Sequence, residues 1–169
     1  MDLSEYQKKA RSTAIYPNIG NNFAYVALGM ADEAGELLEK AYDQNTKRSE
    51  LSKELGDVCW YASQACSEIG ASLADITPSK PELATDIGSL VVAASKIAGK
   101  AKKAIRDDEG VITEEKAKDI EALVGQVLGC VSSYAESLGT TLDKVLEQNI
   151  EKLFSRKERG VLKGSGDNR

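Results

Sequence analysis

Residues 54–70 of the chain read ELGDVCWYASQACSEIG. Apolar side chains recur there every three or four positions, the spacing of one face of an α-helix. This apolar stripe starts just before the segment and comprises Leu51, Leu55, Val58, Cys59, Ala62, Cys66 and Ile69. Gly70 follows the last apolar residue, and glycine commonly ends a helix. The stretch therefore predicts an amphipathic helix over residues 49–69.

The same periodicity runs through most of the chain, which predicts an all-α fold. Further helices are expected over residues 4–15, about 21–43, 83–106, 113–138 and about 140–159. Pro17 should end the first of them, because the residue before a proline resists helical geometry. Aromatic residues make up only 5% of the chain, which argues against a large β core.

Length and charge narrow the possible functions. The 169 residues are enough for one domain with a real core. The net charge of −5 argues against nucleic acid as the main partner. The chain has no histidine, which excludes histidine-based nucleophilic triads, HExxH zinc sites and the ExxH motif of di-iron bundles.

The cysteines and the hydropathy indicate the compartment. Cys59, Cys66 and Cys130 show neither metal-ligand spacing nor a disulfide framework, so buried free thiols in a reducing compartment are expected. The N-terminus lacks a signal-peptide core, and no apolar run approaches the length of a membrane span. We therefore expect a soluble cytoplasmic protein without a membrane partner.

Four carboxylates stand out, in the strings EAGE (residues 33–36) and ELGD (residues 54–57), with seventeen residues between them. Each string places two acids three positions apart, on one face of a helix. Like charges at close range disfavour ionisation, and a divalent cation such as Mg²⁺ relieves that cost. Gly35 and Gly56 lie inside the strings, and glycine within a helix suggests close approach of a neighbouring helix.

The chain also contains an internal repeat. Residues 54–76 align without a gap on residues 123–145, and residues 33–41 align on residues 97–105. The repeat predicts a single domain over residues 1–169, with a first half at about 18–76, a linker at about 77–82, a second half at about 83–160 and a tail at 161–169. All four acids are lost in the second half, where their positions hold Ile97, Lys100, Leu123 and Gln126. Since two of these replacements are apolar, the positions are expected to face inward.

These motifs resemble those of a known family. The pattern Asp32-Glu33-x-x-Glu36, then Glu54-x-x-Asp57 followed by Trp60 and Tyr61, resembles the EExxE…ExxD signature of the all-α nucleotide pyrophosphohydrolases of the MazG type. The likeness extends over most of residues 18–169, and Asp32 in place of the first glutamate is its one departure. The half-degenerate repeat is similar to that of the related dimeric dUTPases.

The resemblance implies a helical bundle built from a tandem, asymmetric repeat. It further implies hydrolysis of nucleoside triphosphates to the monophosphate and pyrophosphate, with Mg²⁺ or Mn²⁺ as cofactor. By matching position, the ligands and catalytic residues would be Glu33, Glu36, Glu54 and Asp57. Glu36 and Glu54 are alternatives for orienting the attacking water. A homodimer is one expected assembly; the alternative is a monomer completed by its own repeat.

Several other residues are candidates for binding the substrate. Trp60 either stacks on a nucleobase or packs in the core. A set on one face of the last helix either grips phosphates or complements the helix dipole: Asn149, Lys152 and Arg156. Lys100 either replaces a metal charge or pairs with a site acid. The tail, with Lys163 and Arg169, either folds over the phosphates or is disordered.

Two rival functions follow from the same residues. One is a dUTPase-like enzyme that also acts on nucleoside diphosphates. The other is a non-catalytic helical interaction protein whose acids are solvated surface residues. Release of orthophosphate from a diphosphate would favour the first, and absence of metal uptake would favour the second.

Overall fold

A computed structural model describes residues 1–79 and 86–164 of the chain. These residues form six α-helices and one short 3-10 helix, which confirms the all-α prediction. The helices are α1 (Leu3–Arg11), α2 (Phe23–Tyr42), α3 (Arg48–Ile69), α4 (Asp86–Asp107), α5 (Glu114–Ser137) and α6 (Leu142–Glu158), and η1 (Leu73–Asp75) is the 3-10 helix.

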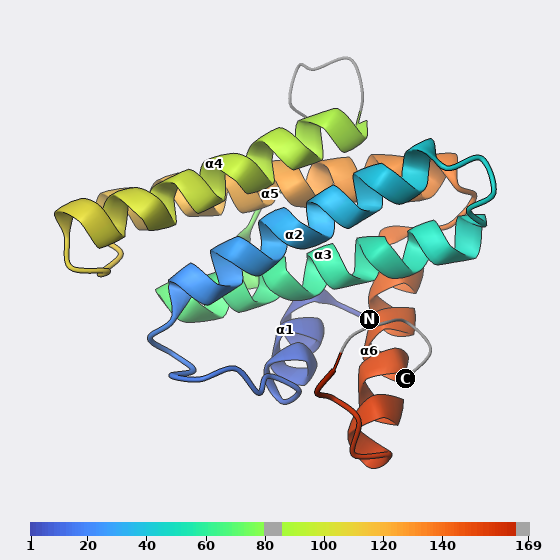
Figure 1. Cartoon of the computed structure of the whole chain (residues 1–169), viewed down its shortest axis with the longest axis horizontal. Helices are drawn as coiled ribbons and strands as arrows, with labels where there is room; N and C mark the ends of the chain where they lie inside the picture. The colour runs from blue at the N-terminus through green and yellow to red at the C-terminus, as the bar shows by residue number, and fades with distance from the viewer. Residues whose placement is uncertain (80–85, 165–169) are drawn as a thin grey trace.

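Four long helices form the body of the molecule (Figure 1). α2 packs against both α3 and α4, and α5 packs against α4 and α3, so the four make a bundle. α1 and α6 lie together along one side, and α6 crosses the direction of the long helices steeply (Figure 1). α6 contacts α3 more extensively than it contacts any other helix, which brings α6 next to the ELGD string.

The helix boundaries follow from local capping chemistry. The side chains of Asn22, Thr113 and Thr141 each accept a hydrogen bond from a backbone N–H in the first turn of α2, α5 and α6. Gly70 closes α3 with φ at 75°, a left-handed conformation that favours glycine. The helices predicted at about 21–43, 113–138 and about 140–159 begin within two residues of the observed α2, α5 and α6.

The first helix is shorter than its periodicity predicts. α1 ends at Arg11 rather than at Ile15. The Thr13 hydroxyl donates to the Ala10 carbonyl oxygen, which gives the end of the helix a local partner. The Arg11 guanidinium is held by Glu68, a residue of α3 that lies 57 positions away. These contacts lead the chain away from the helix axis before Pro17 is reached.

The core is continuous between the helices. Its fully buried side chains include Tyr6, Met30, Leu55, Leu128 and Leu146, and burying one such side chain contributes about 1.5–3 kcal/mol. The three cysteines are free and buried, as expected. In the described part of the chain, no helix is both long and apolar enough to cross a bilayer.

The segment that links the two halves lies against α5 in its described part. The backbone N–H of Ser79 donates to the Gly125 carbonyl oxygen. A Cβ atom at Gly129 would lie 2.1 Å from the Ser79 carbonyl oxygen, so glycine is needed there for the segment to pass. The rest of the linker predicted at 77–82 falls outside the described residues.

Candidate metal and phosphate site

Three of the four predicted acids converge between α2 and α3. Each of Glu33, Glu36 and Glu54 offers a carboxylate oxygen, and these oxygens lie within 4.8 Å of one another. The i, i+3 spacing within α2 places Glu33 and Glu36 on the side of the helix that faces α3. Glu54 is 1% exposed and Glu36 is exposed, so the cluster runs from the protein interior out to solvent.

A lysine that the sequence reasoning missed completes this cluster. The Nζ atom of Lys40 lies 2.5 Å from Oε1 of Glu54. Lys40 follows Glu36 by four positions in α2, so it shares a helix face with the acids. The spacing of four residues from Glu36 is the sequence pattern that predicts its position beside the acids. The buried carboxylate of Glu54 therefore has a cationic partner, as a buried charge requires.

The fourth acid, Asp57, is bound by residues of α6. The Nζ atom of Lys152 lies 2.6 Å from Oδ1 and 2.6 Å from Oδ2 of Asp57. The side-chain amide of Asn149 donates to Asp57 Oδ1 at 3.1 Å, and its oxygen accepts from the Tyr6 hydroxyl at 2.9 Å. Two residues of the second half of the chain thus bind an acid of the first half, Lys152 through its ammonium group and Asn149 through its neutral amide.

The predicted close approach of helices holds for one glycine and is wrong for the other. A Cβ atom at Gly56 would lie 2.9 Å from Cβ of Asn149, so Gly56 lets α6 reach α3. A Cβ atom at Gly35 would meet nothing within 4 Å. Gly35 therefore does not mediate close packing, and Gly56 serves the contact with α6 rather than with α2.

Among the clustered acids, Glu33 has a strongly raised pKa. Burial, followed by the negative charge of Asp57, raises the pKa of Glu33 to about 8. The charges of Glu36 and Glu54 act in the same direction, and Lys152 opposes them. A carboxyl group held under this repulsion favours either a proton or a cation.

The donor set fits a divalent cation of the Mg²⁺ class. Oxygens that share one Mg²⁺ at about 2.1 Å lie about 3–4 Å apart in an octahedron, so the observed cluster needs only small side-chain rotations. The neighbouring ammonium groups of Lys40 and Lys152 already bind to two of these carboxylates. Glu33, Glu36 and Glu54 could hold such an ion, with its remaining positions left for water or phosphate, and Asp57 would join them on release from Lys152.

Aromatic side chains lie beside the acids. Burial, followed by a hydrogen bond with the Tyr25 side chain, raises the pKa of Tyr61, and the negative charges of Glu33 and Asp57 act in the same direction. The Tyr61 ring packs over Gly29 of α2, where a Cβ atom would lie 2.1 Å from the ring. The Tyr25 ring is 6.4 Å from that of Tyr61 and 41% exposed.

Trp60 is tied into the fold by its indole nitrogen. Trp60 Nε1 donates to the Thr13 hydroxyl at 3.0 Å and to the Ala10 carbonyl oxygen at 3.3 Å. Its ring meets Tyr61 edge to face at 4.9 Å between centroids. These contacts favour the core alternative for Trp60, whereas Tyr25 is the more exposed aromatic residue.

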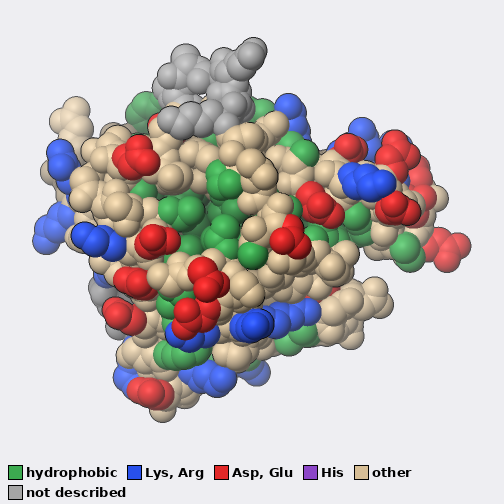
Figure 2. Space-filling model, turned by 180° about the vertical axis from the view of Figure 1, so that it is seen from behind, with side chains coloured by type: hydrophobic (Ala, Val, Ile, Leu, Met, Phe, Trp, Pro, Cys, Tyr) green, Lys and Arg blue, Asp and Glu red, His purple; other side chains and the backbone are tan. Residues whose placement is uncertain are grey.

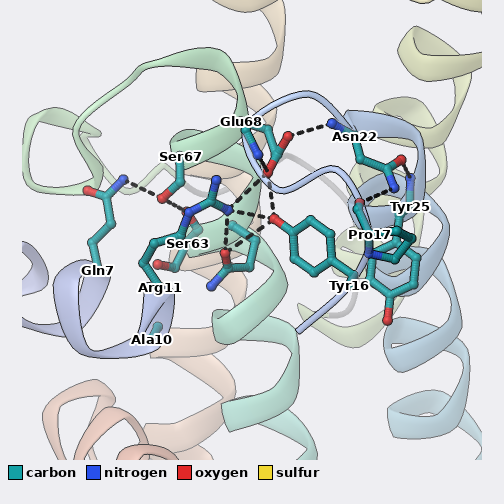
Figure 3. Close-up of polar contacts among 12 residues, drawn as sticks. Gln7, Ala10, Arg11, Tyr16, Pro17, Asn22, Tyr25, Ser63, Ser67 and Glu68 are labelled. Carbon is teal, nitrogen blue, oxygen red and sulfur yellow. Dashed lines mark hydrogen bonds and ion pairs between the residues drawn. The ribbon is translucent and has the colours of Figure 1, made fainter. Parts of the chain in front are cut away.

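The segment that leads into α2 is pinned to α3 by one carboxylate (Figure 3). Glu68 accepts hydrogen bonds from the Tyr16 hydroxyl at 2.6 Å and from the backbone N–H groups of Gly20 and Asn22 at 2.8 and 2.7 Å. Its Oε1 also lies 2.9 Å from the Arg11 guanidinium. Although burial opposes it, this set of donors lowers the pKa of Glu68 below its usual range. The anchor holds the Tyr16 ring stacked at 4.8 Å on Tyr25.

The remaining predicted substrate contacts are placed differently. Lys100 forms an ion pair with Asp119 on α5, which belongs neither to the predicted site acids nor to the α2–α3 cluster. Arg156 is buried at 5% exposure, one turn beyond Lys152. Lys163 is exposed, and Arg169 falls outside the described residues.

On the face of the molecule that lies behind the view of Figure 1, positive and negative charges are mixed. Seen from behind, Lys and Arg side chains are interspersed with Asp and Glu around a central strip of hydrophobic side chains (Figure 2). A nucleic-acid surface would instead be expected to gather its lysines and arginines along one face.

Fold and site together define an all-α bundle with a carboxylate cluster between two helices and a lysine–amide pair supplied by a third. In comparisons with known proteins, 80 residues of the chain are 49% identical to the Gene 37 protein of Mycobacterium phage L5. The match covers 47% of this chain and 70% of the phage protein, and the chain belongs to the same family as that protein. No model of a protein family matches the chain, and no solved structure matches it.

Proposed function

We propose that the protein hydrolyses nucleoside triphosphates to the monophosphate and pyrophosphate in a Mg²⁺-dependent reaction. The observation that carries the proposal is the convergence of the Glu33, Glu36 and Glu54 carboxylates within 4.8 Å. Beside them, Lys152 and Asn149 are bound to Asp57, and Lys152 would be positioned to bind a phosphate oxygen once a cation displaces it from that carboxylate. Acids for a cation and donors for a triphosphate thus lie in one place. Mg²⁺ bound there would supply charge neutralisation of the phosphates and would acidify water.

The exposures of the acids separate their roles. Water attacks the α-phosphorus, the bond to the bridging oxygen breaks, and pyrophosphate leaves with that oxygen. Glu54 is buried and bonded to Lys40, whereas Glu36 is exposed at the mouth of the cluster. Of the two alternatives for orienting the attacking water, this favours Glu36. No protein nucleophile is needed, in keeping with a chain that lacks histidine.

The aromatic residues indicate where the base would lie. The charges of Glu33 and Asp57 act on Tyr61, and Tyr25, whose ring lies 6.4 Å from that of Tyr61 between centroids, is 41% exposed. Aromatic faces stack on any nucleobase. The base is therefore expected against Tyr25 and Tyr61, with the phosphates toward Lys152 and Asn149.

The decisive experiment is a panel of nucleoside triphosphates with Mg²⁺, assayed for pyrophosphate. Glu36→Gln and Asp57→Asn should each lose turnover by about a hundredfold or more while retaining the helical circular dichroism signal. Glu39→Gln is the matched control, since Glu39 is an exposed acid of the same helix outside the cluster.

Other outcomes would point elsewhere. Orthophosphate released from nucleoside diphosphates would favour the dUTPase-like alternative. Failure to cleave any nucleotide, combined with no uptake of Mn²⁺ by calorimetry, would overturn the catalytic proposal in favour of an interaction protein.

A further inference from the structure

A second crevice lies between α4 and α5, away from the acid cluster. It is a groove of about 440 Å³. Three lysines of α4 line it, Lys96, Lys100 and Lys103, together with the small or apolar residues Gly99, Ala122 and Leu123. The lysines follow one another at intervals of four and three positions, so they share one face of α4. The groove shares no residue with the α2–α3 cluster.

The groove carries a surplus of positive charge. Against three lysines its lining holds one acid, Asp119, which pairs with Lys100, so the net charge is +2. Lys96 and Lys103 are exposed at the rim. Asp119 offsets the charge of Lys100, so the net positive charge of the lining comes from Lys96 and Lys103, and an anion bound beside them would offset that charge in turn. The apolar floor formed by Ala122 and Leu123 offers a surface for the uncharged part of a ligand.

The internal repeat relates the residues of this groove to residues of the first half of the chain. In the register of the repeat, Lys96 stands at the position of Asp32, Lys100 at that of Glu36, Lys103 at that of Glu39 and Leu123 at that of Glu54. The crevice between the two helices of the second half therefore corresponds in place to the acid cluster of the first half, but only Lys100 stands at a cluster position, that of Glu36, while Ile97 and Leu123 replace Glu33 and Glu54. Lys96 and Lys103 lie beside it at the positions of Asp32 and Glu39, and the three ammonium groups can bind phosphate directly.

We propose that the α4–α5 groove is a metal-independent binding site for a di- or triphosphate, either free or as part of a nucleotide. The ammonium groups of Lys96, Lys100 and Lys103 bind the phosphate oxygens. A nucleoside, when present, lies on the floor of Ala122 and Leu123. Such a site responds to nucleotide or pyrophosphate without turning it over. The inference does not depend on the catalytic proposal, because either crevice can bind or fail to bind on its own.

The test is a calorimetric titration of the full chain in excess EDTA, so that cation-mediated binding at the acid cluster is suppressed. Pyrophosphate and ADP are the two probes. Binding of both with similar affinity identifies a phosphate site, and tighter binding of ADP shows that the floor contacts the nucleoside. The double variant Lys96→Gln, Lys100→Gln should weaken either probe about tenfold or more.

Two further variants separate a built site from general attraction to a positive surface. Gly99→Leu projects a side chain where a Cβ atom meets nothing within 4 Å, so it should fill the groove without disturbing the helix and should weaken ADP binding. Lys118→Gln removes the same charge from α5 outside the groove, at an exposed pair with Glu114, and should leave both affinities unchanged.

The proposal is overturned by any of three results. The first is absence of binding in EDTA. The second is equal weakening by Lys118→Gln, which would reflect net charge alone. The third is loss of binding in Glu33→Gln together with full binding in Gly99→Leu, which would place the ligand at the acid cluster.

Discussion

The ammonium group of Lys152 lies 2.6 Å from both carboxylate oxygens of Asp57, a residue 95 positions earlier in the chain. This contact joins α6 to α3 and places a second-half cation against a first-half acid. A divalent cation and Lys152 would compete for the same two oxygens. Once displaced from Asp57, Lys152 would be positioned to bind a phosphate.

Replacing Lys152 should therefore affect the metal and the nucleotide in opposite directions. In Lys152→Met we expect Mn²⁺, titrated without nucleotide, to bind about three- to tenfold more tightly, because its competitor is gone. The KM for a nucleoside triphosphate should rise, because a phosphate contact is lost. Calorimetry and steady-state kinetics measure the two effects. Lys144→Met, an exposed position of the same helix, is the control. Unchanged or weaker Mn²⁺ binding would contradict the competition.

The two glycines of the acidic strings offer a matched pair of substitutions. Gly56→Ala should lower the free energy of unfolding by about 1–3 kcal/mol, because the new methyl group would press on Asn149 at 2.9 Å. Gly35→Ala should raise it by about 0.5–1 kcal/mol, because open space surrounds the position and alanine favours the helix. Denaturant unfolding measures both. Equal destabilisation of the two variants would show that α6 does not depend on Gly56.

The contrast between these glycines also shows what the sequence could and could not predict. Helical periodicity and ending residues such as Gly70 located the helices, because these signals act within one or two turns. The sequence also identified Glu33 and Glu54 as neighbours, through their motif. Which helix faces a given glycine is set by packing between distant segments, and no local pattern encodes that.

The same limit explains the residues that were missed or misplaced. α1 ends early, at Arg11, whose guanidinium bonds to Glu68, and that pairing arises only after α1 and α3 have come together. Lys100 turns to Asp119 on the neighbouring helix rather than to the acids of the other half. Lys40 was accessible to sequence reasoning, since it follows Glu36 by one helical turn.

Substitutions of the aromatic residues should separate stability from substrate binding. Trp60→Phe removes the hydrogen bonds from Nε1 to Thr13 and Ala10, so it should lower the free energy of unfolding by about 1 kcal/mol and leave the KM unchanged. Tyr25→Ala should raise the KM about tenfold, since stacking on a base contributes about 1–3 kcal/mol. It should leave Mn²⁺ affinity unchanged, because the tyrosine offers no ligand. Thermal unfolding and kinetics measure these effects. A raised KM in Trp60→Phe with unchanged stability would instead support stacking of Trp60 on the nucleobase.

The raised pKa of Glu33 makes both stability and metal binding depend on pH. Its value moves from 4.5 to about 8 in the folded protein, so the folded state holds a proton that the unfolded state releases. The resulting stabilisation is complete below the unfolded pKa and is lost as the pH rises through the folded pKa. We expect the unfolding free energy to fall by about 1–3 kcal/mol between about pH 5 and about pH 9 without metal. Mn²⁺ affinity should rise over the same interval, because the cation binds the ionised carboxylate.

Glu33→Gln isolates this carboxyl group, because glutamine is neutral throughout that range. The variant should flatten the pH dependence of the unfolding free energy, and above about pH 8 it should be more stable than the parent protein. Its Mn²⁺ affinity should be low and nearly independent of pH. Glu39→Gln, an exposed acid of the same helix, should keep the parent profile. Denaturant unfolding and Mn²⁺ titration at each pH give the two curves. If the slope persisted in Glu33→Gln, the proton would reside on another member of the cluster, and Glu33 would not be the group on which burial and the charge of Asp57 act together.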